Sequence, residues 1–236
     1  MVGVALFAPH SLLPDHTVQR GLDLNLAHAS AATMASGDIS STGDNGTLYF
    51  GYGSNLWKTQ MLKRCPSSVY QGIARLNGYR WIINDRGYAN VVQTSNTASD
   101  EVWGLVYSLT PSDESKLDLN EGVPYAYTKE NLLVDSWPFP TTSEDGKPDV
   151  GAAPERKEML VYIDRVRTEA DAPKREYVYR MNRGVADAVA EGVPEGYVRD
   201  VVRRFIPAED RDGGDSGGGE VEVLARRQAE RFVDEG

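Results

Sequence analysis

The sequence has few of the side chains that most often carry enzyme chemistry. Its 236 residues include one cysteine, Cys65, and three histidines. The histidines, His10, His16 and His28, all lie near the N-terminus. A lone cysteine cannot form an internal disulfide, which is typical of a reducing, intracellular setting. If the N-terminal stretch lies outside the folded domain, that domain has no imidazole. This argues against a Ser-His-Asp triad, a Cys-His pair and a His-bearing metal site.

The sequence also lacks a basic excess and long apolar runs. It carries 25 Lys and Arg against 35 Asp and Glu, a net charge of −10. Such a surface repels phosphate backbones, so we expect no nucleic-acid partner. The apolar run 2–8 ends at Pro9 and is too short to span a membrane. No basic region precedes it, and residues 1–46 hold one arginine against four aspartates, which is atypical of signal peptides and mitochondrial presequences. We therefore predict a cytoplasmic protein without membrane association.

Composition divides the chain into three parts. Residues 1–46 are rich in Ala, Ser and Gly and contain a single aromatic residue, Phe7, which predicts a disordered extension. Aromatic and apolar residues then recur through 47–207, the expected folded domain. The first part of residues 208–236 is rich in Asp, Arg and Gly and includes three consecutive glycines. This composition predicts a flexible linker, followed by a short, charged, weakly amphipathic helix at 220–234.

Hydrophobic periodicity within 47–207 predicts a mixture of strands and helices. Thr110 and Pro111 are typical of an N-cap and a first helical residue, so we expect a helix from 111 to about 120. The predicted loop 137–157 contains four prolines. The expected strands are 47–52, 71–84, 88–93, 102–109, 127–136 and 158–167, and the other expected helices are 55–64, 174–190 and 194–206. This order predicts the α+β class, with a small mixed β-barrel or sheet and flanking helices.

The segment Tyr52-Gly53-Ser54-Asn55-Leu56 joins the first strand to a helix. Amide groups at such a helix start point outward and favour an anionic or carbonyl oxygen. An ordinary capped turn would explain the same residues. No Gly-Lys-Ser/Thr follows, so the segment is not a P-loop, and it lacks the G-x-S-x-G pattern of a nucleophile elbow. Ser54 has no evident base and is not assigned as a nucleophile.

A second candidate segment is 117–123, which contains Glu121 at the predicted end of a helix. Without histidine, a general base must be a carboxylate, lysine, tyrosine or cysteine. An isolated glutamate at a helix end is most often a solvated surface residue. Spacing alone therefore leaves both interpretations of Glu121 open.

Three motifs in order resemble the γ-glutamylcyclotransferase family. Residues 48–56, LYFGYGSNL, are similar to its opening Y-F-x-Y-G-S-N-L signature, and residues 100–107, DEVWGLVY, to its D-E-V-W-G-V-V-W strand. Residues 117–123, LDLNEGV, resemble the L-D-x-x-E-G-V segment that carries the family's catalytic glutamate. The resemblance covers about 47–207. It implies a small β-barrel-like α+β fold in which the Gly53 loop and Glu121 face one pocket.

The resemblance also implies a reaction and a set of roles. The family cyclises a γ-glutamyl amide to 5-oxoproline and releases the attached amino acid, with the substrate's own α-amine as nucleophile. Glu121 would be the general acid/base. No metal or organic cofactor is required, and glutathione metabolism and a homodimer are expected. The implied substrate-binding residues are Tyr52, Gly53, Ser54, Asn55, Leu56 and Tyr177.

Two alternatives remain open at the level of the sequence. The loop 137–157 and the segment 184–194 are longer than the family pattern, and the segment after Glu121 is shorter. These differences would suit the same chemistry on γ-glutamylamines or glutathione-derived adducts in specialised metabolism. The other alternative is a non-catalytic small-molecule binding module on the same fold.

Overall fold

The chain folds around a five-stranded closed barrel. The computed structural model describes residues 46–95, 99–139, 146–208 and 218–230, all within one compact unit, Gly43–Gly236. Strand β1 pairs antiparallel with β5 and parallel with β7, which closes the barrel in the order β1-β5-β2-β6-β7. Strands β3 and β4 form a separate two-stranded sheet. The strands are β1 Thr47–Gly51, β2 Val69–Asn77, β3 Tyr79–Ile83, β4 Ala89–Gln93, β5 Glu101–Leu109, β6 Thr128–Pro138 and β7 Glu155–Ile163. The predicted α+β class with a small mixed barrel is confirmed.

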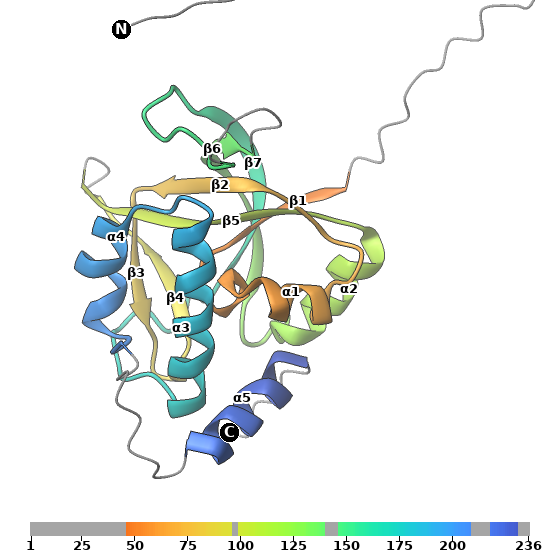
Figure 1. Cartoon of the computed structure of the whole chain (residues 1–236), viewed down its shortest axis with the longest axis vertical. Coiled ribbons are helices and arrows are strands. Elements are labelled where there is room, and N and C mark those ends of the chain that lie inside the picture. The colour runs from red at the N-terminus through yellow and green to blue at the C-terminus, as the bar shows by residue number, and fades with distance from the viewer. Residues whose placement is uncertain (1–45, 96–98, 140–145, 209–217, 231–236) are drawn as a thin grey trace, which may run out of the picture. The chain divides into compact units, whose positions relative to one another are not determined.

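Helices flank the barrel and join its strands (Figure 1). Helix α2 begins as predicted, because the Thr110 hydroxyl accepts a hydrogen bond from the Asp113 amide at 3.2 Å and Pro111 occupies the first turn. The helices are α1 Lys58–Arg64, α2 Pro111–Asn120, α3 Arg175–Ala190, α4 Glu195–Asp200 and α5 Gly218–Glu230, with 3₁₀ turns η1 Ser54–Leu56 and η2 Val202–Arg204.

Three predicted elements are divided in the structure. The single strand expected at 71–84 is two strands that belong to different sheets, with Gly78, at φ +76°, between β2 and β3. The helix expected at 55–64 is a 3₁₀ turn and then α1, since Trp57 is extended between them. The helix expected at 194–206 is likewise α4 followed by η2, with a break at Val201.

The predicted loop 137–157 is shorter at both ends. Strand β6 continues to Pro138, which pairs with Gly72 of β2, and β7 already begins at Glu155, which pairs with Ser136. The residues that extend β7 toward its start, 155–158, are exposed polar ones, so an apolar pattern could not reveal them. The strand predicted at 158–167 ends at Ile163. Within the loop, 140–145 lie outside the described residues.

Helix α5 begins at Gly218, two residues before the predicted start, and packs on α1 and α3 (Figure 1). Ala225 and Ala229 are completely buried, although the sequence predicted only a weakly amphipathic helix. The disordered extension predicted at 1–46 lies outside the described residues except for Gly46, as do residues 209–217 of the predicted linker and the helix predicted beyond 230.

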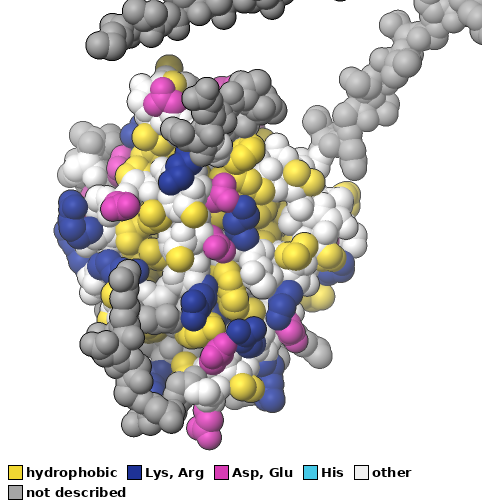
Figure 2. All heavy atoms as spheres, in the orientation of Figure 1, with side chains coloured by type: hydrophobic (Ala, Val, Ile, Leu, Met, Phe, Trp, Pro, Cys, Tyr) yellow, Lys and Arg dark blue, Asp and Glu magenta, His cyan; other side chains and the backbone are white. Residues whose placement is uncertain are grey.

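A glycine sets how closely α3 approaches the loop after β1. A Cβ at Gly184 would lie 2.9 Å from Leu56 Cβ and from Trp57 N, closer than side chains pack. Because Gly184 has no side chain, the loop after β1 and α3 can lie close together. This contact positions both of them at the site. On the face drawn in Figure 2, acidic, basic and hydrophobic side chains are interspersed. No helix among the described residues is long and apolar enough to cross a membrane.

Candidate active site

A small pocket, with a volume of about 40 Å³, opens where the loop after β1 faces the end of α2. Five of the predicted substrate-binding residues and Glu121 line it, which brings the two candidate segments together. The lining residues are Tyr49, Tyr52, Gly53, Ser54, Asn55, Arg64, Tyr88, Ala89, Asn120, Glu121, Tyr127, Tyr162, Tyr177 and Arg180.

Glu121 is the C-cap of α2, and its side chain is only 16% exposed. Its Oε1 accepts a hydrogen bond from Asn55 Nδ2 at 2.9 Å and lies 3.9 Å from Arg64 Nη1. Burial raises the pKa of Glu121, while Arg64 and the Asn55 hydrogen bond oppose that shift. A raised carboxyl pKa suits a group that takes up and returns a proton near neutral pH. The alternative of a solvated surface glutamate is therefore wrong.

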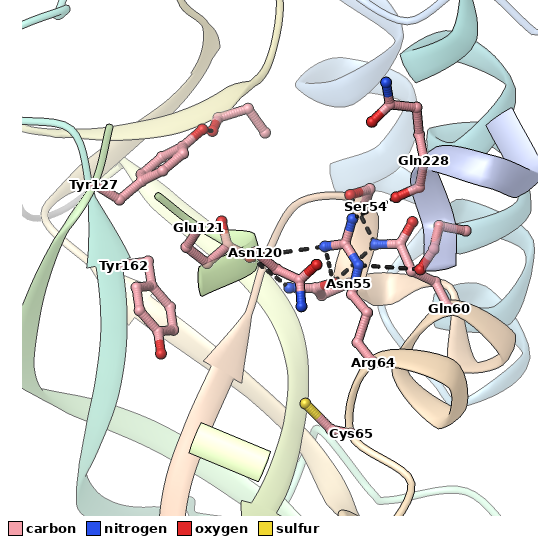
Figure 3. Close-up of polar contacts among 12 residues, drawn as sticks. Ser54, Asn55, Gln60, Arg64, Cys65, Asn120, Glu121, Tyr127, Tyr162 and Gln228 are labelled. Atoms are coloured by element: carbon pink, nitrogen blue, oxygen red, sulfur yellow. Dashed lines mark hydrogen bonds and ion pairs between the residues drawn. The ribbon is translucent and has the colours of Figure 1, made fainter. Parts of the chain in front are cut away.

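The Asn55 side chain links Glu121 to α1 (Figure 3). Its amide nitrogen donates to both Tyr49 Oη, at 2.8 Å, and Glu121. Its amide oxygen accepts from Gln60 Nε2 at 2.8 Å and from Arg64 Nη1 at 3.1 Å. All four partners restrict the amide to one orientation, so Asn55 acts through its side chain in addition to the backbone role that the sequence suggested.

Ser54 belongs to a second polar cluster on the α3 side of the pocket. Its hydroxyl accepts hydrogen bonds from Gln60 Nε2 at 2.9 Å and Arg180 Nη1 at 3.0 Å. Arg180 in turn forms a buried ion pair with Glu176, with Nε–Oε2 at 2.8 Å. The two groups that contact the Ser54 hydroxyl, an amide and a guanidinium, are both donors and neither is a base. This agrees with the decision not to assign Ser54 as a nucleophile.

Tyr177 of α3 also lines the pocket. Its hydroxyl oxygen accepts hydrogen bonds from the amides of Ser54, at 3.1 Å, and Ala89, at 3.2 Å. Burial raises the pKa of Tyr177 to about 12, so the hydroxyl keeps its proton at neutral pH. Because both acceptor positions are taken by amides, the proton is available for donation to a ligand oxygen.

The structure adds detail to three of the predicted binding residues. The Ser54 amide donates to Tyr177 Oη and the Leu56 amide donates to Gly53 O at 2.9 Å, so these two amides are engaged within the protein. The Leu56 side chain is buried in the core and does not line the pocket. The Tyr52 hydroxyl donates to Tyr162 O at 2.6 Å, and Tyr52 forms a wall of the pocket.

The sequence did not reveal Gln60, which donates to Ser54 and Asn55, or several polar residues that line the pocket: Arg64, Arg180, Tyr49 and Tyr127. Gln60 and Arg64 are four residues apart and both are buried on one side of α1, a spacing that could have been noticed. Glu176 and Arg180 have the spacing of an ordinary solvated pair, and only the fold shows that both are buried.

Cys65 takes no part in the site. It is fully buried, its thiol lies 3.6 Å from Asp113 O, and burial followed by the Asp113 carboxylate raises its pKa to about 12. A thiol with that pKa is not a nucleophile at neutral pH. No group of three or more His, Cys, Asp and Glu in the described part of the chain could hold a metal ion.

Comparisons with known proteins agree with this geometry. The family model described as "Gamma-glutamyl cyclotransferase, AIG2-like" matches residues 49–181. A protein from Bos taurus named gamma-glutamylcyclotransferase is 34% identical over 93 residues, which are 36% of this chain and 50% of that protein. The Homo sapiens protein of the same name is 31% identical over the same shares. The chain thus spans about half the length of the curated relatives it matches.

Solved structures show the same fold. One named gamma-glutamyl cyclotransferase has a TM-score of 0.54 at 23% identity and covers 77% of this chain and 99% of its own. A human structure described as an uncharacterized protein gives the same values. The family match extends over more than half of the chain and includes both segments that face the pocket. The chain therefore belongs to the gamma-glutamyl cyclotransferase, AIG2-like family.

Proposed function

We propose that the protein is a γ-glutamylcyclotransferase, a lyase that converts a γ-glutamyl amino acid or dipeptide into 5-oxoproline and a free amine. The observation that carries the proposal is the Glu121 carboxyl, held in the pocket by Asn55 with its pKa raised by burial. Membership of the family and the names of the relatives support the same activity. Glu121 would be the catalytic acid/base.

The pocket has the charges that a γ-glutamyl group needs. Such a group carries an α-ammonium and an α-carboxylate beside the scissile amide. Glu121 is suited to the ammonium, and the guanidinium groups of Arg64 and Arg180 give the pocket positive charge that favours a carboxylate. Opposite charges in a poorly solvated pocket interact more strongly than in water, so both ends of the zwitterion would be oriented.

The reaction requires one proton acceptor that is also a donor. The α-amine nitrogen forms a bond to the γ-carbonyl carbon, and the bond from that carbon to the leaving nitrogen breaks. Overall the attacking nitrogen loses two protons and the leaving nitrogen gains two. Glu121 would carry both protons from the first nitrogen to the second, one at a time, and would end in its starting state. Attack within one molecule can lower the barrier by about 7–11 kcal/mol when the chain is held folded.

Tyr177 would stabilise the oxygen that becomes negative in the transition state. Its hydroxyl already accepts two amide hydrogen bonds, which polarise the O–H bond and orient its proton. An oxyanion-hole donor of this kind contributes on the order of 3–4 kcal/mol. Tyr52 would support the substrate chain as a wall, and Gly53, Ser54 and Asn55 would shape the floor.

The direct test is quantification of 5-oxoproline by mass spectrometry across a panel of γ-glutamyl compounds. The panel contains γ-glutamyl amino acids and dipeptides, γ-glutamylamines, glutathione and glutathione adducts. We expect product from the amino acid or dipeptide members and a loss of about 10³-fold in kcat for Glu121→Gln, within the range for acid–base groups. Glu158→Gln is the matched control, because it makes the same change on an exposed residue of β7. Full activity of Glu121→Gln would contradict the mechanism.

The same panel decides between the alternatives. Preference for γ-glutamylamines or glutathione-derived adducts would keep the chemistry and assign the protein to specialised metabolism. Binding of a γ-glutamyl compound, measured by calorimetry, with no 5-oxoproline from any member would favour a non-catalytic binding module. A role in glutathione metabolism, a cytoplasmic location and a homodimer stay predictions, to be checked by the panel, by microscopy of a tagged protein and by sedimentation.

A further inference from the structure

We propose that the C-terminal helix α5 is a positioning element for Glu121, acting through Arg64. The proposal rests on the proposed function, in which Glu121 is the acid/base. It concerns a segment that lies beyond residues 49–181, the part of the chain that the family match covers. Arg64 and α5 would not transfer protons themselves but would set the position and charge environment of the Glu121 carboxylate.

All three nitrogens of the Arg64 guanidinium are engaged, and they connect α5 to the pocket (Figure 3). Nε donates to Ala229 O at 3.2 Å and Nη2 to Gln228 O at 2.9 Å, both on α5. Nη1 donates to Asn55 Oδ1 at 3.1 Å and lies 3.9 Å from Glu121 Oε1. The side chain is 3% exposed. One planar group thus joins the C-terminal helix to the catalytic carboxylate and to the amide that holds it.

The end of α5 is chemically suited to hold a cation. The last four carbonyls of a helix have no partner within the helix, and the helix dipole makes that end negative. Ala229 and Gln228 belong to the last turn of α5. Their carbonyl oxygens satisfy two guanidinium nitrogens without neutralising the positive charge, because they carry no net charge themselves. The charge of Arg64 therefore remains available to act on Glu121.

Small side chains allow α5 to pack closely enough for these contacts. Ala225 and Ala229 are four residues apart and fully buried, in a helix that packs on α1 and α3. At the surface, Lys63 Nζ of α1 lies 2.7 Å from Glu230 Oε1 of α5. An alanine stripe with one ion pair at its edge makes the packing of α5 sensitive to a single larger side chain.

Arg64 is the cation that forms an ion pair with Glu121 among the described residues. Arg180, from α3, is paired with Glu176. Arg86, between β3 and β4, lies over the rings of Tyr88 and Tyr127. Loss of Arg64 from its place would thus remove the nearest charge that lowers the pKa of Glu121 and would raise that pKa. The other titratable groups that act on Glu121 or are acted on by it are Tyr49, Tyr52, Cys65, Tyr127, Tyr162 and Tyr177.

The test displaces α5 in the full-length protein and follows the pH dependence of kcat/KM. Ala225→Glu and Ala225→Arg place a long side chain in the buried stripe; Val223→Glu and Val223→Arg are the matched controls, because Val223 is exposed on the same helix. We expect the acidic limb of the kcat/KM profile to move up by about one pH unit in both Ala225 variants. This is the low end of the pKa change that an opposite charge within 4–6 Å produces. The controls should keep the wild-type limb. A direct effect of the new charge would instead move the two Ala225 variants in opposite directions, which would overturn the proposal.

A double-mutant cycle shows whether the effect passes through Arg64. Arg64→Gln alone should move the limb as far as Ala225→Glu does, and the double variant should move it no further. The proposal would be overturned if the shifts were additive. It would also be overturned if both Ala225 variants kept the acidic limb of the wild-type pH profile. If the Ala225 variants do not fold, Lys63→Glu repels Glu230 at the surface and should move the limb in the same direction. The exchange Lys63→Glu/Glu230→Lys should then return the acidic limb to its wild-type position. An acidic limb that stays in the wild-type position in both variants would also overturn the proposal.

Failure of the proposed function is recognised separately. It would appear as no 5-oxoproline from wild-type protein with any γ-glutamyl compound. In that case the titration of Glu121 is read by ¹³C NMR as the difference between wild type and Glu121→Gln. An upward shift of the Glu121 midpoint in the Ala225 variants would support the role of α5, and an unchanged midpoint would overturn it.

Discussion

Two buried arginines reach the pocket from different helices, and they differ in the groups that surround them. Arg180 of α3 forms a two-point ion pair with Glu176 one turn earlier, with 2.8 and 3.2 Å between the paired atoms. Arg64 of α1 is surrounded by two carbonyls and an amide, and its nearest carboxylate is Glu121 at 3.9 Å. Arg180 is paired with a carboxylate of its own helix, whereas the carboxylate nearest to Arg64 is the candidate acid/base.

The difference assigns a separate task to each side of the pocket. On the Arg180 side, the guanidinium fixes the Ser54 hydroxyl and lies 5.0 Å from the Tyr177 ring centre, so it supports the proposed oxygen donor. On the Arg64 side, it acts on the proposed proton acceptor. Burial, and then repulsion from Arg180, lowers the pKa of Arg64 to about 10. Arg64 still carries its charge at neutral pH.

The largest expected effect is on stability and comes from the Arg180 side. Glu176→Gln leaves Arg180 buried without its carboxylate, and breaking one partner of a buried pair costs about 3–5 kcal/mol of unfolding free energy. Urea denaturation measures this loss. The chain offers a matched control in Glu222→Gln, which removes the same i,i+4 pairing with Arg226 on the exposed face of α5 and should cost about 0.5 kcal/mol or less.

Comparable losses of unfolding free energy in Glu176→Gln and Glu222→Gln would contradict the buried pairing of Arg180 with Glu176. It would mean that the interior around Arg180 rearranges or admits enough water to solvate the free guanidinium. A large loss for Glu176→Gln with a normal pH profile of the remaining activity would support a structural role for this pair.

The next effect is catalytic and tests the oxygen donor. Tyr177→Phe removes the hydroxyl that accepts from the Ser54 and Ala89 amides, and kcat should fall about 10²–10³-fold, as for the loss of an oxyanion-hole donor. Steady-state kinetics with the best γ-glutamyl substrate measures it. Tyr52→Phe is the control, since the Tyr52 hydroxyl donates to Tyr162 O instead. That variant should lose about 1 kcal/mol of stability and little of kcat, and an equal fall in kcat for both would refute the assignment.

The fold and the chemistry of the pocket were predictable from the sequence to different degrees. The apolar and aromatic strands, and the capped start of α2 at Thr110, follow local rules and were predicted close to their bounds. The divisions at Gly78 and Trp57 depend on single backbone angles, which a hydrophobic pattern does not encode. Glu121 could be assigned only by resemblance, because composition and spacing give the same signal for a solvated glutamate.

The two arginines illustrate why the rest of the site was missed. Both belong to segments in which a charged residue is normally solvated, and nothing local marks them as buried. Arg64 is covered by a helix more than 150 residues later in the chain, as its hydrogen bond to Ala229 shows. Only the tertiary fold brings these partners together, so no window along the sequence contains the information.

The smallest expected effect is the pH dependence of stability, and it decides whether burial or Arg64 dominates at Glu121. Burial raises the pKa of Glu121 above that of an unfolded glutamate, near 4.3. The folded state then binds the proton more tightly than the unfolded state. Its stabilising contribution is fully present below the unfolded pKa and is lost as pH rises through the folded one. Glu121→Gln removes this titration, so its unfolding free energy relative to wild type should increase from pH 4 to pH 7. Urea denaturation at both pH values measures the change, which should be smaller than the Glu176→Gln effect, and Glu158→Gln should show none. A relative stability that falls over the same interval would mean that Arg64 and Asn55 favour the carboxylate more than burial disfavours it, and the acid/base would then need substrate in the pocket to reach a useful pKa.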